Sequence, residues 1–237
     1  MKYIIFNWKS YLNGKESFSL AKSLNKLKFS KKYKIIISPS SYSLFALKNN
    51  FKNIELSSQN FDTLGSGGYT SFLPIENLSN FSIKYSLIGH SEVRKYRNEN
   101  DLIVKSKLIL ANEYKINPII CIGEDFKTYK NNKTKPYIKN QIKKIFNKQI
   151  KYQNLFIAYE PLWSIGSGLV PSNQEIIKII EYIRFLLKDY SFKKLKILYG
   201  GSVNSSNFEE LNEIKELDGF LVGSASIKKS FIKIFCN

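Results

Sequence analysis

The chain has 237 residues, of which 43% are hydrophobic and 14% aromatic, so it can bury a large core and is not intrinsically disordered. Its two cysteines, Cys121 and Cys236, exclude a disulfide-rich secreted scaffold and favour a cytoplasmic setting. Its apolar runs fall short of the ~20 residues of a membrane span, and the first is too short for a signal peptide. We therefore expect no membrane partner.

The charge is strongly positive, with 37 Lys and Arg against 19 Asp and Glu and a net charge of +18. Such an excess could indicate a nucleic-acid-binding protein. Only three of the basic residues are arginine, however, and arginine is the side chain that phosphate-reading proteins usually favour. Abundant Lys, Asn, Ile, Tyr and Phe suggest the compositional bias of an AT-rich genome. We expect a solvated lysine-rich surface and no specific nucleic-acid partner.

Eight short apolar runs recur about 30 residues apart, which is the length of one βα unit. They are residues 3–6, 34–38, 54–57, 85–88, 118–122, 155–159, 196–199 and 219–222. Continuous apolar runs are typical of strands that are buried on both faces of a parallel sheet.

Polar stretches with helical periodicity separate these runs, for example residues 103–114, 137–148 and 174–188. Two capping boxes, Ser172 with Glu175 and Ser206 with Glu209, predict helix starts. Eight such units, with no linker between them, predict a single-domain (β/α)8 barrel over residues 1–237. The alternative is an open doubly wound sheet, which would usually carry a Gly-rich turn after its first strand.

The active sites of barrels form at the C-terminal ends of the strands. Lys9 follows the first run, His90, the chain's one histidine, follows the fourth, and Glu160 follows the sixth. Gly/Ser turns follow the last two runs, where barrels commonly hold a phosphate. Each residue alone has an ordinary structural explanation, but together they predict one site.

The segments at these strand ends resemble the motifs of the triosephosphate isomerase family, in the same order and along essentially the whole chain. The main matches are Asn7-Trp8-Lys9, Gly89-His90-Ser91-Glu92, Tyr159-Glu160-Pro161 with residues 163–168, and Tyr199-Gly200-Gly201-Ser202-Val203. Further matches are Ser58-Gln59-Asn60, Cys121-Ile122-Gly123-Glu124 and Asp218-Gly219-Phe220-Leu221-Val222-Gly223. The resemblance implies a TIM barrel that interconverts dihydroxyacetone phosphate and D-glyceraldehyde 3-phosphate in glycolysis and gluconeogenesis.

The resemblance also implies a role for each matching residue. Glu160 would be the base, neutral His90 would donate a hydrogen bond to the enediolate oxygens as in the family's known mechanism, and Lys9 would supply positive charge. Asn7 would position oxygens, and Glu92 would support His90 or relay protons. No metal or cofactor is implied.

Backbone N–H groups would hold the substrate phosphate, and a lid would close over it. The phosphate-binding residues implied are Gly166, Ser202, Gly223 and Ser224. The lid and its hinges would comprise Leu162, Trp163, Ser164, Ile165, Gly166, Ser167, Gly168, Leu169, Val170 and Pro171. Leu162 and Trp163 would form the first hinge, and residues 169–171 the second.

The segment Gly68-Tyr69-Thr70-Ser71-Phe72 resembles the loop that inserts into the partner of a homodimer. Tyr69 and Thr70 would then approach the partner near Lys9 and Glu92. The chain departs from the family pattern where Val93 stands for an arginine, Phe72 for an acidic residue and Ser224 for a glycine. These departures concern the interface and the phosphate site. A barrel enzyme with another sugar phosphate, and a degenerate or nucleic-acid-binding barrel, are the competing hypotheses.

Overall fold

The computed structural model describes residues 1–51, 53–165 and 169–237. Its eight strands are all parallel and pair in sequence order into a closed barrel, with β1 also paired to β8. They are β1 (Lys2–Asn7), β2 (Tyr33–Ser38), β3 (Glu55–Ser58), β4 (Tyr85–Ile88), β5 (Asn117–Ile122), β6 (Lys151–Tyr159), β7 (Ser191–Tyr199) and β8 (Gly219–Val222). The predicted (β/α)8 class is confirmed, and the open sheet is excluded.

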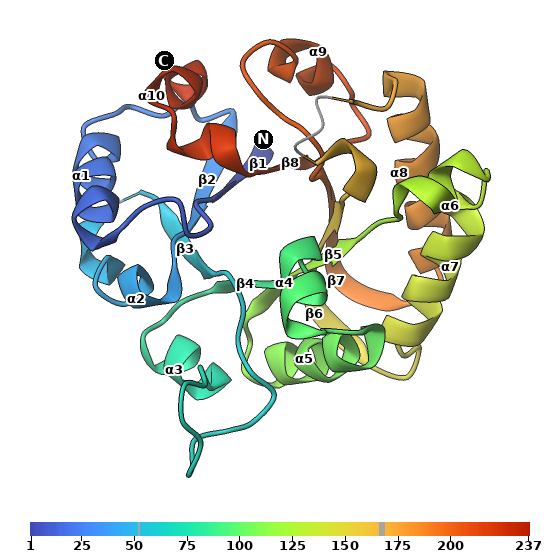
Figure 1. Cartoon of the computed structure of the whole chain (residues 1–237), viewed down its shortest axis with the longest axis horizontal. Coiled ribbons are helices and arrows are strands. Elements are labelled where there is room, and N and C mark those ends of the chain that lie inside the picture. The colour runs from blue at the N-terminus through green and yellow to red at the C-terminus, as the bar shows by residue number, and fades with distance from the viewer. Residues whose placement is uncertain (52, 166–168) are drawn as a thin grey trace.

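The helices surround the barrel, as Figure 1 shows. The α-helices are α1 (Gly14–Leu24), α2 (Ser41–Leu44), α3 (Ile75–Asn80), α4 (Ser91–Arg97), α5 (Asp101–Glu113), α6 (Phe126–Lys130), α7 (Thr134–Ile145), α8 (Asn173–Leu187), α9 (Phe208–Asn212) and α10 (Lys229–Ile232). Four 3-10 helices are η1 (Lys48–Asn50), η2 (Leu162–Ser164), η3 (Ser224–Ile227) and η4 (Lys233–Phe235). Within the ranges described, every helix is too short or too polar to cross a membrane.

Two apolar cores explain why the strands read as unbroken apolar runs. In β1, Ile4 and Phe6 pack outward with the helices, while Tyr3 and Ile5 belong to a separate cluster inside the barrel. Because side chains alternate along a strand, seven of the eight strands contribute to both cores; β3 contributes Leu56 to the outer core alone. The site at the end of the barrel therefore stands on a framework that is packed on both faces.

Two strands start four and five residues earlier than the apolar runs predict, at Lys151 and Ser191. In these extensions Tyr152 pairs with Phe192 across the ladder, and their rings stack at 5.5 Å between centroids. Polar residues alternate with the aromatic ones here, so a search for continuous apolar residues misses this part of the sheet.

The capping prediction is right for one helix and wrong for another. Ser172 Oγ accepts a hydrogen bond from the Glu175 N–H at 3.3 Å, and the Ser172 N–H donates to Glu175 Oε2 at 2.9 Å. By contrast, α9 begins at Phe208, and Ser206 does not cap it. The N-cap of α9 is Asn207, and the Ser206 N–H and hydroxyl both donate to Asn204 Oδ1, at 2.8 and 2.6 Å.

Asp218 holds the strand ends together at the opposite end of the barrel. Its carboxylate lies 2.6 Å from both Arg184 Nη2 and Lys196 Nζ, and it accepts the Ile197 N–H at 2.9 Å. Burial alone would raise the pKa of Asp218, but these hydrogen bonds lower it below its ordinary value.

Candidate active site

Lys9 and Asn7 are fixed by the turn that ends β1. The backbone of Lys9 is left-handed, with φ of 49°, a conformation that costs a non-glycine residue about 1 kcal/mol. The turn is held because the Lys9 N–H donates to Asn7 Oδ1 at 3.0 Å and Gln59 Nε2 donates to the Lys9 carbonyl at 2.8 Å. The Lys9 ammonium lies 2.7 Å from Glu92 Oε1.

His90 stands between β4 and α4 and is buried. Its Nδ1 accepts a hydrogen bond from the Glu92 N–H at 3.3 Å, which fits the tautomer that carries its proton on Nε2. That Nε2 lies 3.3 Å from Asn7 Nδ2 and 3.4 Å from Glu160 Oε1. Two donors, Asn7 Nδ2 and His90 Nε2, therefore converge on one place, an arrangement suited to a negatively charged oxygen.

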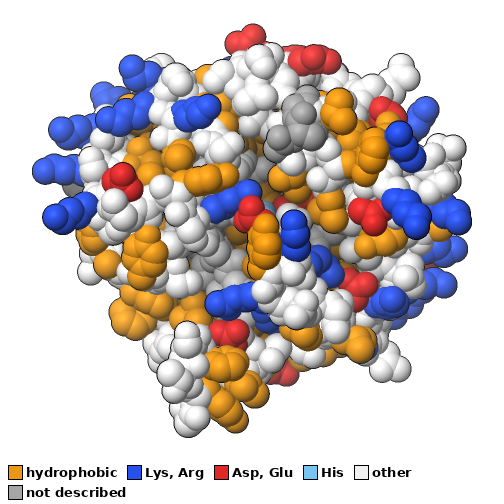
Figure 2. Space-filling view, in the orientation of Figure 1, with side chains coloured by type: hydrophobic (Ala, Val, Ile, Leu, Met, Phe, Trp, Pro, Cys, Tyr) orange, Lys and Arg blue, Asp and Glu red, His pale blue; other side chains and the backbone are white. Residues whose placement is uncertain are grey.

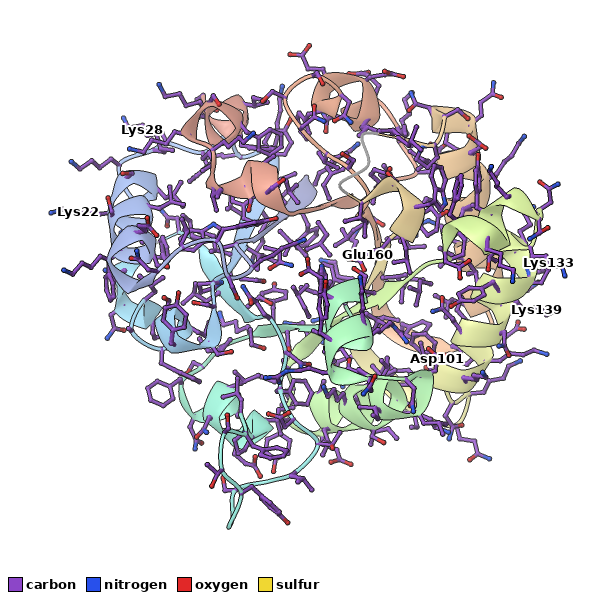
Figure 3. All side chains as sticks on the ribbon, in the orientation of Figure 1. Lys22, Lys28, Asp101, Lys133, Lys139 and Glu160 are labelled. Carbon is purple, nitrogen blue, oxygen red and sulfur yellow. The ribbon has the colours of Figure 1, made fainter. Side chains whose placement is uncertain are left out.

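Glu160 follows β6 and lies at the centre of the ring of strands in Figure 3. It is only 2% exposed, and its Oε2 accepts the Ser91 N–H at 3.2 Å. Its own N–H donates to the Ile122 carbonyl at 2.7 Å. A Cβ on Gly123 would lie 1.7 Å from the Glu160 carbonyl oxygen, so only glycine fits beside this backbone.

The segment that carries His90 is held by charged residues that sequence analysis did not single out. Gly89 adopts φ of 72°, and its N–H donates to Glu99 Oε1 at 2.7 Å. Glu99 is buried and ion-paired with Lys107, whose ammonium also donates to Asn60 Oδ1 at 2.8 Å. Arg94 Nε donates to the Gly89 carbonyl at 2.7 Å. Of these contacts, only the one between Lys107 and Asn60 joins segments that are distant in sequence; the others lie within about ten residues of each other but follow no motif that the sequence analysis used.

A cavity of about 120 Å³ opens beside these groups. Its lining includes Lys9, His90 and Glu160 together with glycine and serine residues of the last two strand ends. Three of the residues that the resemblance assigned to phosphate binding, Ser202, Gly223 and Ser224, line this cavity, whereas Gly166 lies outside the described residues. The Ser202 N–H donates to Ser164 Oγ at 3.3 Å. Tyr11 also lines this cavity, although no sequence motif drew attention to it.

The first predicted hinge is anchored on Glu124, which is fully buried. Trp163 Nε1 and the Tyr159 hydroxyl donate to Glu124 Oε1 at 3.0 and 3.1 Å, and the Leu162 N–H donates to the Glu124 carbonyl at 2.9 Å. Burial, together with the Glu124 carboxylate, raises the pKa of Tyr159, so its hydroxyl remains a donor.

The other described residues of the predicted lid differ in their exposure to solvent. Ser164 and Pro171 are buried, Ile165 lines the 120 Å³ cavity, and Leu169 and Val170 are exposed. The predicted lid residues Gly166, Ser167 and Gly168 lie outside the part of the chain that the structure describes.

Comparison with known proteins decides the family. The sequence model of the triosephosphate isomerase family matches residues 2–237. The triosephosphate isomerase of Buchnera aphidicola subsp. Baizongia pistaciae is 37% identical, with 100% of this chain and 98% of the relative covered. The enzyme of the same name from Mycoplasma mobile is 35% identical, with 98% of each covered. The one from Clostridium botulinum (strain Okra / Type B1) is 36% identical, with 96% of each covered.

The chain belongs to the triosephosphate isomerase family. The structure brings together the five residues whose catalytic roles the resemblance implied, namely Asn7, Lys9, His90, Glu92 and Glu160. All five stand at or just beyond the C-terminal ends of barrel strands or at the start of α4.

The segment that resembles the family's dimer loop projects away from the barrel between β3 and α3, at the bottom of Figure 1. Its base is closed by the Leu73 N–H, which donates to Asp62 Oδ2 at 2.6 Å. Tyr69 and Phe72 are 53% and 46% exposed, and their ring centroids lie 5.8 Å apart. A separate hollow of about 410 Å³ beside Lys9 is lined by residues including Glu92 and Val93.

Proposed function

We propose that this protein interconverts dihydroxyacetone phosphate and D-glyceraldehyde 3-phosphate, with Glu160 as the base. The observation that carries the proposal is the contact between the buried Glu160 carboxylate and the His90 imidazole, 3.4 Å apart, at the end of a family-matched barrel. Lys9 and the Gly/Ser turns border the same cavity and suit an anionic substrate.

The reaction needs a proton to move between adjacent carbons. Glu160 takes the proton from the carbon beside the carbonyl, and the C–H electron pair forms the enediolate while the carbonyl oxygen gains negative charge. His90 Nε2–H and the Lys9 ammonium stabilise that oxygen. Glu160 then returns a proton to the neighbouring carbon, and His90 assists transfer between the two oxygens. Asn7 orients the oxygens, and Glu92 holds Lys9 and His90.

In the structure, two groups of the proposed site, the Glu160 carboxylate and the Ser202 N–H, make hydrogen bonds to other residues of the protein. Glu160 Oε2 accepts from Ser91, and the Ser202 N–H donates to Ser164. We propose that substrate binding releases both bonds, so that the carboxylate turns to the substrate and Ser202 binds its phosphate. Gly166, Gly223 and Ser224 would complete the phosphate site, and closure of residues 162–171 would exclude water.

The assembly proposed is a cytoplasmic homodimer of single-domain barrels that acts in glycolysis and gluconeogenesis. The exposed Tyr69 and Phe72 support an interface, because two neighbouring exposed aromatic rings on a projecting loop favour burial against a partner. The hollow beside Lys9 offers a place for the loop of a second copy. Phe72 and Val93 would replace a charged pair by an apolar contact.

The alternative of a nucleic-acid-binding barrel has little support from the arrangement of charge. Figure 2 shows Lys and Arg side chains at opposite edges of the molecule. In Figure 3, Lys22 and Lys28 point outward on one side, while Lys133 and Lys139 do so on the other. Dispersed lysines suit a solvated surface better than one binding face.

A coupled assay of triose phosphate interconversion tests the function, with the Glu160→Asp variant as its partner measurement. Shortening the side chain withdraws the carboxylate by about 1 Å, which can cost ~100-fold in rate. We expect an active wild type and a folded variant with roughly that loss. An inactive wild type that binds DNA in a salt-dependent manner would favour the alternative, and an undiminished kcat in the variant would refute Glu160 as the base.

A further inference from the structure

Tyr129 of α6 lies against the first hinge of the proposed lid. Its ring stacks on Trp163 with 4.0 Å between centroids and 23° between planes. Trp163 also donates to buried Glu124 at 3.0 Å, so its indole is held at its edge and on its face. The stack joins two segments 34 positions apart in the sequence.

The same side chain reaches the element that follows the second hinge. The Tyr129 hydroxyl donates to Glu175 Oε1 at 3.0 Å. Glu175 Oε2 in turn accepts from the Ser172 N–H at 2.9 Å and from Ser172 Oγ at 2.8 Å, which forms the N-terminal cap of α8. Pro171 immediately precedes this cap.

We propose that Tyr129 is a positioning residue that ties the two flanks of the lid to each other. Its ring fixes Trp163 at the start of the lid, and its hydroxyl fixes Glu175 just after the lid's end. The tie sets the relative position of the two flanks without contact with substrate. This inference rests on the proposed function, because a lid matters only if residues 162–171 enclose a reacting substrate.

The protonation states of the pair suit this role. The hydrogen bond to Glu175 raises the pKa of Tyr129, so the phenol remains a donor at neutral pH. The hydrogen bonds from Ser172 lower the pKa of Glu175, so it remains a charged acceptor. A hydrogen bond to a charged acceptor is stronger than one between neutral groups.

Loss of the tie has a chemical signature beyond a change in stability. An enediolate phosphate that is exposed to water breaks its C–O bond, phosphate leaves with the electron pair, and a three-carbon dicarbonyl compound remains. The ratio of inorganic phosphate released to triose phosphate isomerised therefore reports how well the lid encloses the intermediate. Because it is a ratio, it does not depend on the fraction of the preparation that is folded.

Two variants separate the halves of the tie. Tyr129→Phe keeps the ring and removes the hydroxyl, and Tyr129→Leu removes the stack as well. The matched control is Tyr182→Phe, on the same side of the barrel, whose ring contacts Lys135 at 5.2 Å instead of the lid. We expect the control to behave like wild type.

The experiment measures kcat/KM and phosphate released per turnover for the full chain and each variant. We expect Tyr129→Phe to lower kcat/KM about tenfold, the size of one hydrogen bond to a charged group. The same variant should raise the phosphate released per turnover at least threefold. We expect Tyr129→Leu to lower kcat/KM further and to release more phosphate per turnover than Tyr129→Phe. If phosphate release rises less than threefold in both variants, the proposed role of Tyr129 is refuted. If the wild type is inactive, the proposed function itself is refuted.

Discussion

Replacement of Lys107 by methionine should destabilise the fold far more than an ordinary lysine substitution. Lys107 and Glu99 are 3% and 4% exposed, and the ammonium group is shared between Glu99 and Asn60. Methionine fills most of the space, but it leaves the charged, buried Glu99 carboxylate without the ammonium group of Lys107. Among the described residues, the donor that then remains to the Glu99 carboxylate is the Gly89 N–H, at 2.7 Å, and Gly89 immediately precedes His90.

Removal of one member of a buried ion pair typically costs ~3–5 kcal/mol, because the other charge remains desolvated. For a chain of this size 1 kcal/mol corresponds to roughly 2–4 °C in Tm, so we expect Tm to fall by roughly 6–20 °C. Activity should also fall at temperatures where the variant is folded, since the Gly89 turn positions His90.

Chemical unfolding followed by fluorescence measures the loss, and a second variant tests its cause. The double variant with Lys107→Met and Glu99→Gln also removes the unpaired negative charge of Glu99. It should recover a large part of the lost stability, which would appear as strong coupling in a double-mutant cycle. The reasoning fails if Lys107→Met costs less than ~1 kcal/mol, or if the two substitutions add without coupling.

Three further predictions concern the site, the interface and acid stability. Lys9→Ala should lower kcat/KM ~100-fold or more and weaken an inhibitor that mimics the phosphate; unchanged inhibitor affinity and turnover would contradict its role. Phe72→Glu should weaken the dimer in sedimentation, and adding Val93→Arg should restore part of the loss, whereas a cycle without coupling would mean that the two side chains do not meet. The folded pKa of Asp218 is lowered, so its contribution to stability is present above the unfolded pKa of ~3.9 and disappears as pH falls through the folded value. The stability difference between wild type and Asp218→Asn should therefore shrink on acidification, and a difference that is constant with pH would refute this linkage.

The barrel could be predicted from sequence because its strands are buried on both faces and therefore appear as continuous apolar runs. The same criterion misses the starts of β6 and β7, where Tyr152 and Phe192 alternate with polar residues. The prediction that Ser206 caps a helix was wrong because its hydroxyl donates to Asn204 Oδ1 at 2.6 Å and the N-cap of the helix is Asn207, the residue after the one that the motif suggests.

The residues of the candidate site also differ in how well the sequence alone predicts them. Lys9, His90 and Glu160 could be found because each follows a recognisable strand. The contact between Tyr129 and Glu175 could not be predicted, because it joins helices 46 positions apart and depends on side-chain packing. Local patterns therefore locate the residues at strand ends, while the contacts that hold them require the structure.

Isomerisation in deuterium oxide tests most directly whether a protein carboxylate carries the proton. A proton held on Glu160 exchanges with solvent before it returns to carbon, so we predict that triose phosphate formed by the wild type carries deuterium on the carbon that receives the proton, as detected by NMR. Product in which that carbon holds only protium would mean that the hydrogen passes between the carbons without exchange, and it would contradict an exchanging proton on Glu160.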